Sequence, residues 1–523
     1  MTTTGFPATG LNGAQALVRT LLRSGVDTCF ANPGTSEMHF VAALDQVAGM
    51  RCVLGLFEGV VTGAADGYAR MAGKPAATLL HCGPGLANGL ANLHNARRAE
   101  TPIVTLVGDQ ATFHRPLDPP LTADTEGWAR PVSIWTRTAA ASAEVGPDAA
   151  EAVRAARTAP GGVATLILPS DVCWNDGGVV ADPLPVPAAP RVDEAAITKA
   201  RELLRSGEPC ALLLGSGATR GGHLALAARI GAATGAKVFT PFAAGRLERG
   251  RGRHPIPRLP FPLDQAMAAL AGVRHLLLVG RTRPMAFFAY PGRPQTPEPA
   301  GALIHVLAPP GHDLGDALSR LADRLEAPEI APPVWAEAPP PARGPVTSEA
   351  VARTLNALLP EGAVVVDESV SFGRPFFVAT HSAAPHDWLA LAGGAIGAGL
   401  PMATGAALAA PGRRVVSLQA DGSALYTLQA LWTQAREALD VTTVLLSNRK
   451  YAILQGELAN VGARPGRAAQ DLLSLGRPDM DWVKLAGGFG VEAARCETME
   501  RFAELFAHAN RRSGPFLIEL VIP

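Results

Sequence analysis

The chain has 523 residues, 48% of them hydrophobic, and its 46 basic side chains are balanced by 46 acidic ones. This balance excludes the strongly basic surface that binding to nucleic acid or to an anionic membrane requires. No apolar run approaches the length that spans a membrane, and the N-terminal residues MTTTGFPATG do not resemble a signal peptide. We therefore expect a cytoplasmic protein, with about three domains for a chain of this length.

The cysteines favour the same compartment. They are scattered along the sequence, and no two form a C-x-x-C pair. This pattern is typical of small core residues in a reduced, cytoplasmic protein. The six positions are Cys29, Cys52, Cys82, Cys173, Cys210 and Cys496.

Two proline-rich segments predict the domain boundaries. Residues 181–191 and 327–345 cannot form regular helix or central strand. The parts that they separate all alternate strand-like and helix-like patterns, which indicates an α/β protein with parallel sheets flanked by helices. We expect three domains, at residues 1–180, 192–326 and 346–523.

The first informative segments lie near the N-terminus. Residues 30–37 (FANPGTSE) indicate a strand that runs into a turn. A second strand over residues 52–56 leads to Glu58 and a helix rich in small residues (VVTGAADGYARMAG). A carboxylate at such a junction is costly unless it is paired or partly protonated. A helix N-cap or a buried salt bridge would also explain Glu58.

A third strand, over residues 77–81, ends at His81. The sequence then predicts a glycine-rich turn (GPG, residues 83–85) and a helix that contains Asn88. A lone histidine is usually structural, and Asn88 is also consistent with an ordinary polar residue of a helix.

The middle of the chain contains a segment close to a dinucleotide-binding fingerprint, residues 211–221 (ALLLGSGATRG). Its glycine spacing is one residue off, and the next strand-like run (AKVFTPF) has no acidic residue at its end. We therefore predict a tight turn between strand and helix, and no nucleotide site.

The most informative segment is near the C-terminus. A short buried strand over residues 415–418 is followed by Asp421-Gly422-Ser423, a helix over 424–437, a strand ending at Ser447, and Asn448. The carboxylate and carboxamide therefore follow two strands, which is where an open α/β sheet binds ligands. Hard oxygen ligands suit magnesium, and a helix N-terminus suits a phosphate. An Asp-Gly turn alone is common.

Together these segments resemble the thiamine diphosphate (ThDP) enzymes of the acetolactate synthase, benzoylformate decarboxylase and pyruvate decarboxylase family. The resemblance covers essentially the whole chain, in the family's order. It rests on FEGVVTGAADGYARMAGKP, on AGGAIGAGLPMATGAAL (392–408), and on ADGS through SNRKY. It implies a pyrimidine-binding, a middle and a diphosphate-binding domain.

The resemblance assigns the diphosphate end of the cofactor. Asp421, Asn448 and the backbone carbonyl of Lys450 would bind Mg²⁺, and Gly422 and Ser423 would contact the diphosphate. Two further cofactor-binding residues follow in the same loop, Tyr451 and Ala452. FAD, which some relatives bind in the middle domain, is not expected.

The resemblance also assigns the other end of the cofactor. Ile396 would force its bent shape, although Ile396 could equally be ordinary core. The carbonyl of Gly394 would accept a hydrogen bond from the 4′-amino group. Glu58 would share a proton with N1′ of the pyrimidine. Gly34, in the NPGT turn, and Asn88 would line the cofactor site.

For the substrate, His81 matches a histidine of the benzoylformate decarboxylases that acetolactate synthases generally lack. Thr35 matches a substrate-contacting serine of the decarboxylases, and His114 falls in an expected active-site loop. The sequence also departs from the family. Ala420 replaces the usual glycine before the aspartate, and Ser447 replaces the first asparagine of the usual pair. Residues 453–455 lack the tryptophan of the synthases, and Leu454 is expected to line the pocket.

The resemblance therefore implies a ThDP- and Mg²⁺-dependent lyase that decarboxylates a 2-oxo acid, joins the resulting enamine to another carbonyl, or does both. An acetolactate synthase-type transferase is the alternative. A nucleotide-binding oxidoreductase is disfavoured by the failed fingerprint. A non-catalytic paralogue is disfavoured because Glu58, Asp421 and Asn448 are all present. We expect a homodimer or homotetramer.

Overall fold

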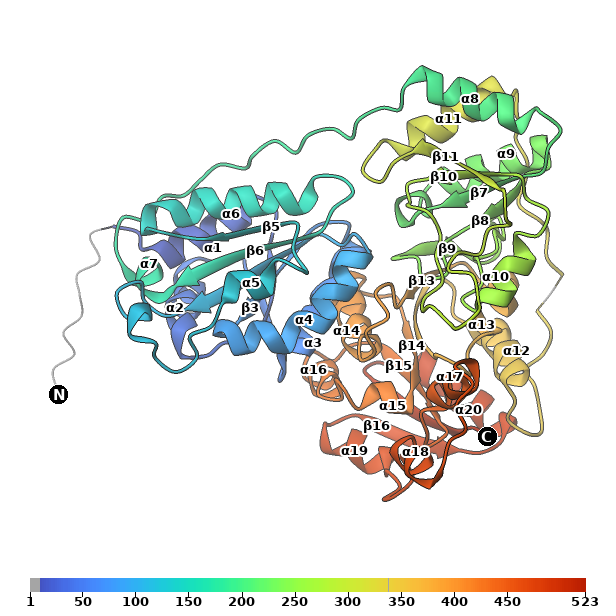
Figure 1. Cartoon of the computed structure of the whole chain (residues 1–523). Coiled ribbons are helices and arrows are strands. Elements are labelled where there is room, and N and C mark those ends of the chain that lie inside the picture. The colour runs from blue at the N-terminus through green and yellow to red at the C-terminus, as the bar shows by residue number, and fades with distance from the viewer. Residues whose placement is uncertain (1–9, 337) are drawn as a thin grey trace. The chain divides into compact units, whose positions relative to one another are not determined.

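A computed structural model of the chain describes residues 10–336 and 338–523 (Figure 1). These residues form two compact units. The first comprises residues 10–188, 392–411 and 427–437, and the second comprises the other described residues. Residues 1–9, most of the N-terminal segment discussed above, lie outside the described residues.

The first unit is built on a six-stranded sheet in the order β2-β1-β3-β4-β6-β5. Every neighbouring pair of strands in it is parallel. The four inner strands β1, β3, β4 and β6 are buried along their full length, as expected for a sheet covered on both faces. The strands are β1 (Thr28–Ala31), β2 (Arg51–Leu54), β3 (Ala76–Leu80), β4 (Ile103–Asp109), β5 (Trp135–Thr138) and β6 (Val163–Pro169).

Helices connect these strands, and two of them pack backbone to backbone. A Cβ atom at Gly67 would lie 2.0 Å from the carbonyl oxygen of Met402, and one at Gly405 would lie 1.8 Å from that of Ala64. The small residues of α3 therefore allow α14 to approach closely. The helices of this unit are α1 (Gly13–Arg23), η1 (Thr35–Glu37), α2 (Met38–Gln46), α3 (Glu58–Ala72), α4 (Cys82–Arg98), η2 (Arg115–Leu117), α5 (Thr125–Ala129), α6 (Ser142–Arg157), α7 (Ser170–Trp174), α14 (Gly399–Ala409) and α16 (Ala430–Arg436).

The second unit contains two sheets, the smaller of which has four parallel strands in the order β11-β10-β7-β8. A Cβ atom at Gly215, after β7, would lie 1.8 Å from the carbonyl oxygen of Gly280. The first glycine of the failed fingerprint therefore permits close packing of two strand ends. The strands are β7 (Cys210–Leu214), β8 (Lys237–Phe239), β10 (His275–Val279) and β11 (Leu303–Ala308).

The larger sheet has seven strands in the order β16-β17-β15-β14-β12-β13-β9. All neighbours are parallel except β9, which comes from the middle of the chain and runs antiparallel to β13. The strand order reverses between β12 and β14, which defines a topological switch point. The strands are β9 (Leu247–Arg249), β12 (Ala363–Glu368), β13 (His386–Ala390), β14 (Val415–Ala420), β15 (Val441–Ser447), β16 (Glu492–Cys496) and β17 (Phe516–Val521).

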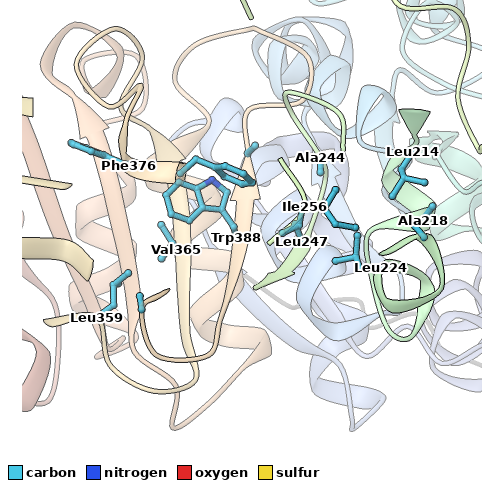
Figure 2. Packing of buried hydrophobic residues seen from close by; sticks show 14 of the residues in the cluster. Leu214, Ala218, Leu224, Ala244, Leu247, Ile256, Leu359, Val365, Phe376 and Trp388 are labelled. Carbon is cyan, nitrogen blue, oxygen red and sulfur yellow. The ribbon is translucent and has the colours of Figure 1, made fainter. Parts of the chain in front are cut away.

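One hydrophobic core joins the two sheets of the second unit (Figure 2). It runs from Leu214 on β7 through Leu247 and Ile256 to Trp388 on β13, whose ring is buried. Burying each such side chain contributes about 1.5–3 kcal/mol. The helices of this unit are α8 (Glu194–Leu204), η3 (Ser216–Ala218), α9 (His223–Thr234), α10 (Leu263–Ala269), α11 (Leu314–Arg324), α12 (Ser348–Leu358), α13 (Phe376–Ala379), η4 (Thr380–Ser382), α15 (Asp421–Ala424), α17 (Ala452–Asn460), α18 (Arg467–Leu472), α19 (Trp482–Gly488) and α20 (Met499–Arg511).

The three mostly parallel sheets flanked by helices confirm the predicted α/β fold class. Within the described residues, no helix is both long and apolar enough to cross a membrane. Five of the six cysteines are buried, as predicted. The prediction is wrong for Cys52, which is exposed on the edge strand β2.

Two predicted local structures differ from those observed. The helix expected over 424–437 is broken into α15 and α16, because the chain turns at residues 425–429. There the hydroxyl of Thr427 donates to the carbonyl of Gly397 over 2.8 Å. The glycine turn expected at 83–85 is instead the first turn of α4. Pro84 is compatible with that position because first-turn N–H groups have no partner within the helix.

Candidate cofactor and substrate site

Glu58 is the first residue of α3, and its side chain is only 7% exposed. The amide Nδ2 of Asn88, on α4, donates to its Oε2 over 3.0 Å. The helix N-cap is Phe57, and no cation pairs with Glu58 among the described residues. Neither alternative raised by the sequence, a cap or a salt bridge, therefore accounts for this buried carboxylate.

The segment around Gly394 and Ile396 lies in the same unit as Glu58. The side chain of Asn95, on α4, holds it by two hydrogen bonds to the backbone of Ala395. The amide Nδ2 donates to the carbonyl over 2.8 Å, and Oδ1 accepts from the N–H over 3.1 Å. Gly394 has a φ of +80°, which favours glycine. Helix α4 thus contributes to positioning both Glu58 and this segment.

His81, directly before α4, is bound to a buried acid. Its Nδ1 lies 2.9 Å from Oε2 of Glu37 and 3.1 Å from Oγ of Ser36. Glu37 is 4% exposed and also accepts from the N–H of Gly34 over 2.7 Å. A Cβ atom at Gly34 would lie 2.3 Å from the ring of His81, so only glycine fits there. With Glu37 ionised, Nδ1 carries the proton and Nε2 is free to accept one.

Cys82 belongs to the same group of side chains. Its Sγ lies 3.2 Å from Oγ of Ser36, and burial raises the pKa of the thiol to about 11. The ligand atoms of Glu37, His81 and Cys82 lie within 4.8 Å of one another. Ser36 contacts all three residues, so these atoms already form a hydrogen-bonded group.

The other two substrate residues expected from the sequence are more exposed. Thr35 opens η1, and His114 precedes η2 in a loop whose Phe113 is 70% exposed. Among the described residues, no hydrogen bond or ion pair joins Thr35 or His114 to Glu58 or His81. Hydrogen bonds therefore join Asn88 to Glu58, and Glu37 to both Gly34 and His81, whereas the roles of Thr35 and His114 stay predictions.

The predicted metal ligands lie together in the second unit, at the carboxyl ends of β14 and β15. Asp421 is buried and accepts from the backbone N–H of Gly422 (2.8 Å) and of Arg449 (2.6 Å). Burial raises the pKa of the Asp421 carboxyl, although these hydrogen bonds act in the opposite direction. Asn448 follows β15, and its Oδ1 accepts from the N–H of Lys450 over 3.1 Å. The carbonyl of Lys450 accepts no hydrogen bond within the described residues.

The remaining diphosphate residues adjoin this group. A Cβ atom at Gly422 would lie 2.6 Å from the ring of Tyr451, so the ring covers a glycine backbone. The Oγ of Ser423 accepts from Gln419 over 2.6 Å. Ala452 begins α17. Helix α15 is a single turn, so N–H groups rather than a long helix dipole are available to an anion here.

Comparison with known proteins identifies the class to which this arrangement belongs. The model of the thiamine pyrophosphate enzyme N-terminal TPP binding domain matches residues 11–127, and that of the C-terminal TPP binding domain matches residues 375–520. The chain belongs to the thiamine diphosphate-dependent enzyme family.

Individual relatives extend the match to the whole chain. A protein of Mycobacterium tuberculosis provisionally named acetolactate synthase large subunit IlvX is 53% identical, over 98% of this chain and 99% of its own. The benzoylformate decarboxylase of Pseudomonas aeruginosa is 31% identical, over 96% of this chain and 97% of its own length. The solved structure of a ThDP-dependent 4-hydroxybenzoylformate decarboxylase from Rhodococcus jostii has a TM-score of 0.82 and 26% identity, with 97% of this chain and 98% of that one covered.

The residues present fit the cofactor. A carboxylate, a side-chain amide oxygen and a main-chain carbonyl that accepts no hydrogen bond from a described residue are oxygen donors of the kind that Mg²⁺ prefers. Gly422 lets the ring of Tyr451 pack directly against the backbone beside these ligands. In the first unit, Glu58 is buried, and no described cation pairs with it. Both conditions suit a carboxylate that shares a proton with a ligand.

Sequence reasoning missed the residues that position these groups. Glu37 follows the NPGT turn by two residues. Its position as an acidic residue next to a predicted site is the signal by which the sequence could have indicated it. Asn92 and Asn95 lie one turn or more beyond Asn88 on the same helix, and Asn92 donates to the carbonyl of Gly59 over 2.8 Å. Their partners are distant in sequence, so no local pattern indicates them.

Proposed function

We propose that the chain is a ThDP- and Mg²⁺-dependent decarboxylase of 2-oxo acids with a site like that of the benzoylformate decarboxylases. A 2-oxo acid and a proton would give an aldehyde and carbon dioxide. ThDP, when bound, supplies the electron sink for the electron pair released as carbon dioxide leaves. Asp421, Asn448 and the carbonyl of Lys450 would hold the magnesium ion.

The observation that carries the decarboxylase assignment is the contact between His81 and the buried Glu37. A decarboxylase must return a proton to the carbon that loses carbon dioxide. The acid orients the imidazole and favours the tautomer with a free Nε2, which suits proton exchange with the substrate. Glu58 would hold the separate proton at N1′ of the pyrimidine.

An acetolactate synthase-type activity is the second candidate, because the relative at 53% identity carries that name. Carboligation requires that protonation be slower than attack on a second carbonyl. A side chain such as His81, held ready to move a proton, favours the aldehyde instead.

A homo-oligomer is part of the proposal. The first unit carries large exposed apolar side chains near His114, including Phe113 (70% exposed) and Leu117 (74% exposed). Side chains of this size at the surface favour an interface with another protein surface, here a second copy of the chain.

The test combines cofactor analysis with product analysis. Purified protein supplied with ThDP and Mg²⁺ is incubated with a panel of 2-oxo acids, and aldehydes and hydroxyketones are quantified. Aldehyde as the main product supports the proposal. Acetolactate as the main product from pyruvate favours the synthase, and failure to bind ThDP rejects both.

A further inference from the structure

Two of the six cysteines lie side by side on neighbouring strands of the first unit. Cys29 is on β1 and Cys52 is on β2, and the two residues are register partners in a parallel pair. Neighbouring strands lie about 4.7–4.9 Å apart. Disulfides span Cα separations of about 4.4–6.8 Å. The backbone therefore already places the two cysteines at a separation that a disulfide can bridge.

Both cysteine side chains leave the sheet on the same face. Successive residues of a strand alternate between the two faces, so register partners point the same way. The next pair along the strands, Phe30 and Val53, is buried on the opposite face. There the ring of Phe30 packs against that of Tyr68 on α3, with centroids 5.8 Å apart. The two sulfur atoms therefore lie on one face of the sheet, next to each other.

The two thiols differ in their access to solvent. Cys29 is fully buried in a core with Leu17 and Leu21 of α1 and Phe40 of α2. Cys52 is exposed, and β2 is an edge strand of the sheet. A dissolved oxidant can therefore reach Cys52 but not Cys29. An accessible thiol beside a protected one is typical of a reactive cysteine and the cysteine that resolves it.

Hydrogen bonding makes Cys52 the more reactive of the two. A hydrogen bond from the Cys29 thiol lowers the pKa of Cys52 below the ordinary value of 9.0, against the effect of burial. The same hydrogen bond, together with burial, raises the pKa of Cys29 well above that value. The thiolate is the form that attacks an oxidant, so Cys52 reacts first.

We propose that Cys29 and Cys52 form a reversible oxidation site for hydroperoxides. The Cys52 thiolate attacks the O–O bond, which breaks. Cys52 becomes a sulfenic acid, and the peroxide leaves as an alcohol after taking up a proton. The Cys29 thiol then attacks the sulfenic sulfur, so that a disulfide forms and water leaves. The two thiols together lose two electrons and two protons, which reduce one hydroperoxide to one alcohol and one water. A dithiol reductant restores both thiols by thiol–disulfide exchange.

The disulfide would join the two strands that lead into the candidate site. Strand β1 leads into the turn that contains Gly34, and β2 leads to Glu58. The loop that the bond closes, residues 29–52, contains Glu37, the acid that contacts His81. Oxidation therefore constrains the segments that position these residues. The disulfide forms without cofactor or substrate, so it is independent of the proposed function.

Peptide mapping tests the inference, because trypsin separates the two cysteines. Cleavage at Arg51 places Cys29 in the peptide 24–51 and Cys52 in the peptide 52–70, and neither peptide contains another cysteine. The purified protein is treated with an equimolar amount of hydrogen peroxide and digested without reductant. Mass spectrometry should find the two peptides joined. Dithiothreitol added before digestion should separate them, and a non-reducing gel should show no chain joined to another.

Single replacements distinguish the two roles. In Cys29→Ala, oxidation of Cys52 should stop at the sulfenic acid, which dimedone traps on the peptide 52–70. In Cys52→Ser, the peptide 24–51 should stay unmodified, because the peroxide does not reach Cys29. The second variant changes an exposed side chain, so the test stands even where Cys29→Ala folds poorly. Cys496→Ala removes a buried cysteine of the second unit and should leave the joined peptides unchanged.

Cys82 provides an internal comparison of rates. Its pKa is about 11, whereas that of Cys52 lies below 9.0. The hundredfold difference in thiolate is partly offset by the lower nucleophilicity of the weaker base, so Cys52 should be oxidised at least about tenfold faster. Oxidation of Cys82 at the same rate would overturn the proposal. So would oxidised Cys52 without joined peptides, or a disulfide between the Cys52 residues of two chains.

Discussion

The amide of Asn88 donates a 3.0 Å hydrogen bond to the carboxylate of Glu58, the first residue of α3. A neutral donor fixes the position of the buried carboxylate without adding a positive charge. The proton that we propose Glu58 shares with a ligand is therefore not opposed by a buried cation, as it would be in a Glu–Arg pair.

Replacing Glu58 should impair cofactor activation without unfolding the protein. In Glu58→Gln, the side chain can still accept from Asn88 but cannot share a proton in the same way. We expect exchange of the C2 hydrogen of bound ThDP for deuterium to slow by about a hundredfold or more, with little change in Tm. NMR of the exchange checks this, with replacement of the exposed Glu349 by Gln as control. Unchanged exchange would reject the role, and a large fall in Tm would indicate a structural one.

Magnesium affinity should fall on mild acidification. Burial raises the pKa of the Asp421 carboxyl above the ordinary value of 3.8. The fold therefore favours the protonated form of Asp421. Without metal, this carboxyl stabilises the fold fully at pH values below its pKa in the unfolded chain. That stabilisation is lost as the pH rises through its pKa in the folded chain. The metal requires the ionised form, so protons compete with it at a higher pH than at an exposed aspartate.

Calorimetric titration with Mg²⁺ and ThDP from pH 7 downward measures this competition. Asp421→Ala should abolish binding throughout, because a diphosphate needs the metal to bridge its charge. Asp471→Ala, an exposed aspartate of the same unit, should behave as the unchanged protein. Retained ThDP affinity in Asp421→Ala, or in the presence of a chelator, would contradict the assignment.

His81 should act on the substrate and not on the cofactor. His81→Ala should retain ThDP affinity and C2 exchange, yet lose about a hundredfold to ten-thousandfold in turnover of its best 2-oxo acid. Glu37→Gln keeps the ring in place but weakens the preference for the free Nε2 tautomer, so a smaller loss and a changed pH–rate profile are expected. Steady-state kinetics across pH measures both variants. Unchanged turnover in His81→Ala would make His81 structural and favour the synthase alternative.

The positions of Glu58, Asp421 and Asn448 at strand ends could be predicted because each depends on a short local pattern. The contacts around these three residues could not be predicted from the sequence. Glu37 and His81 are 44 residues apart, and Asn95 and Ala395 are 300 apart, so only tertiary packing unites them. The break between α15 and α16 has the same origin. The partner of Thr427 is the carbonyl of Gly397. The spacing of apolar residues over 424–437 does not indicate this hydrogen bond.

The cysteines should react in an order set by burial and hydrogen bonding. A hydrogen bond from the Cys29 thiol lowers the pKa of the exposed Cys52, against the effect of burial. Burial raises the pKa of Cys82 to about 11 and of Cys173 to about 12. Since the thiolate is the reactive form, maleimide at neutral pH should label Cys52 first. Mass spectrometry identifies the labelled sites, and Cys52→Ser should remove the fast phase. Labelling of Cys82 at a similar rate would contradict the arrangement around Ser36.

The functional protein should contain at least two copies of the chain. Glu58 belongs to the first unit and Asp421 to the second, and the family resemblance implies that one cofactor is served by such domains from two subunits. Glu58→Gln and Asp421→Ala should each be inactive alone. When the two variants are mixed, unfolded and reassembled together, a mixed dimer can hold one site with both native residues. About a quarter of the activity of the unchanged protein should therefore return if pairing is random.

Each variant reassembled by itself is the control. Light scattering that finds a fully active monomer, or mixtures that stay inactive although both variants refold to dimers, would contradict a site shared between subunits.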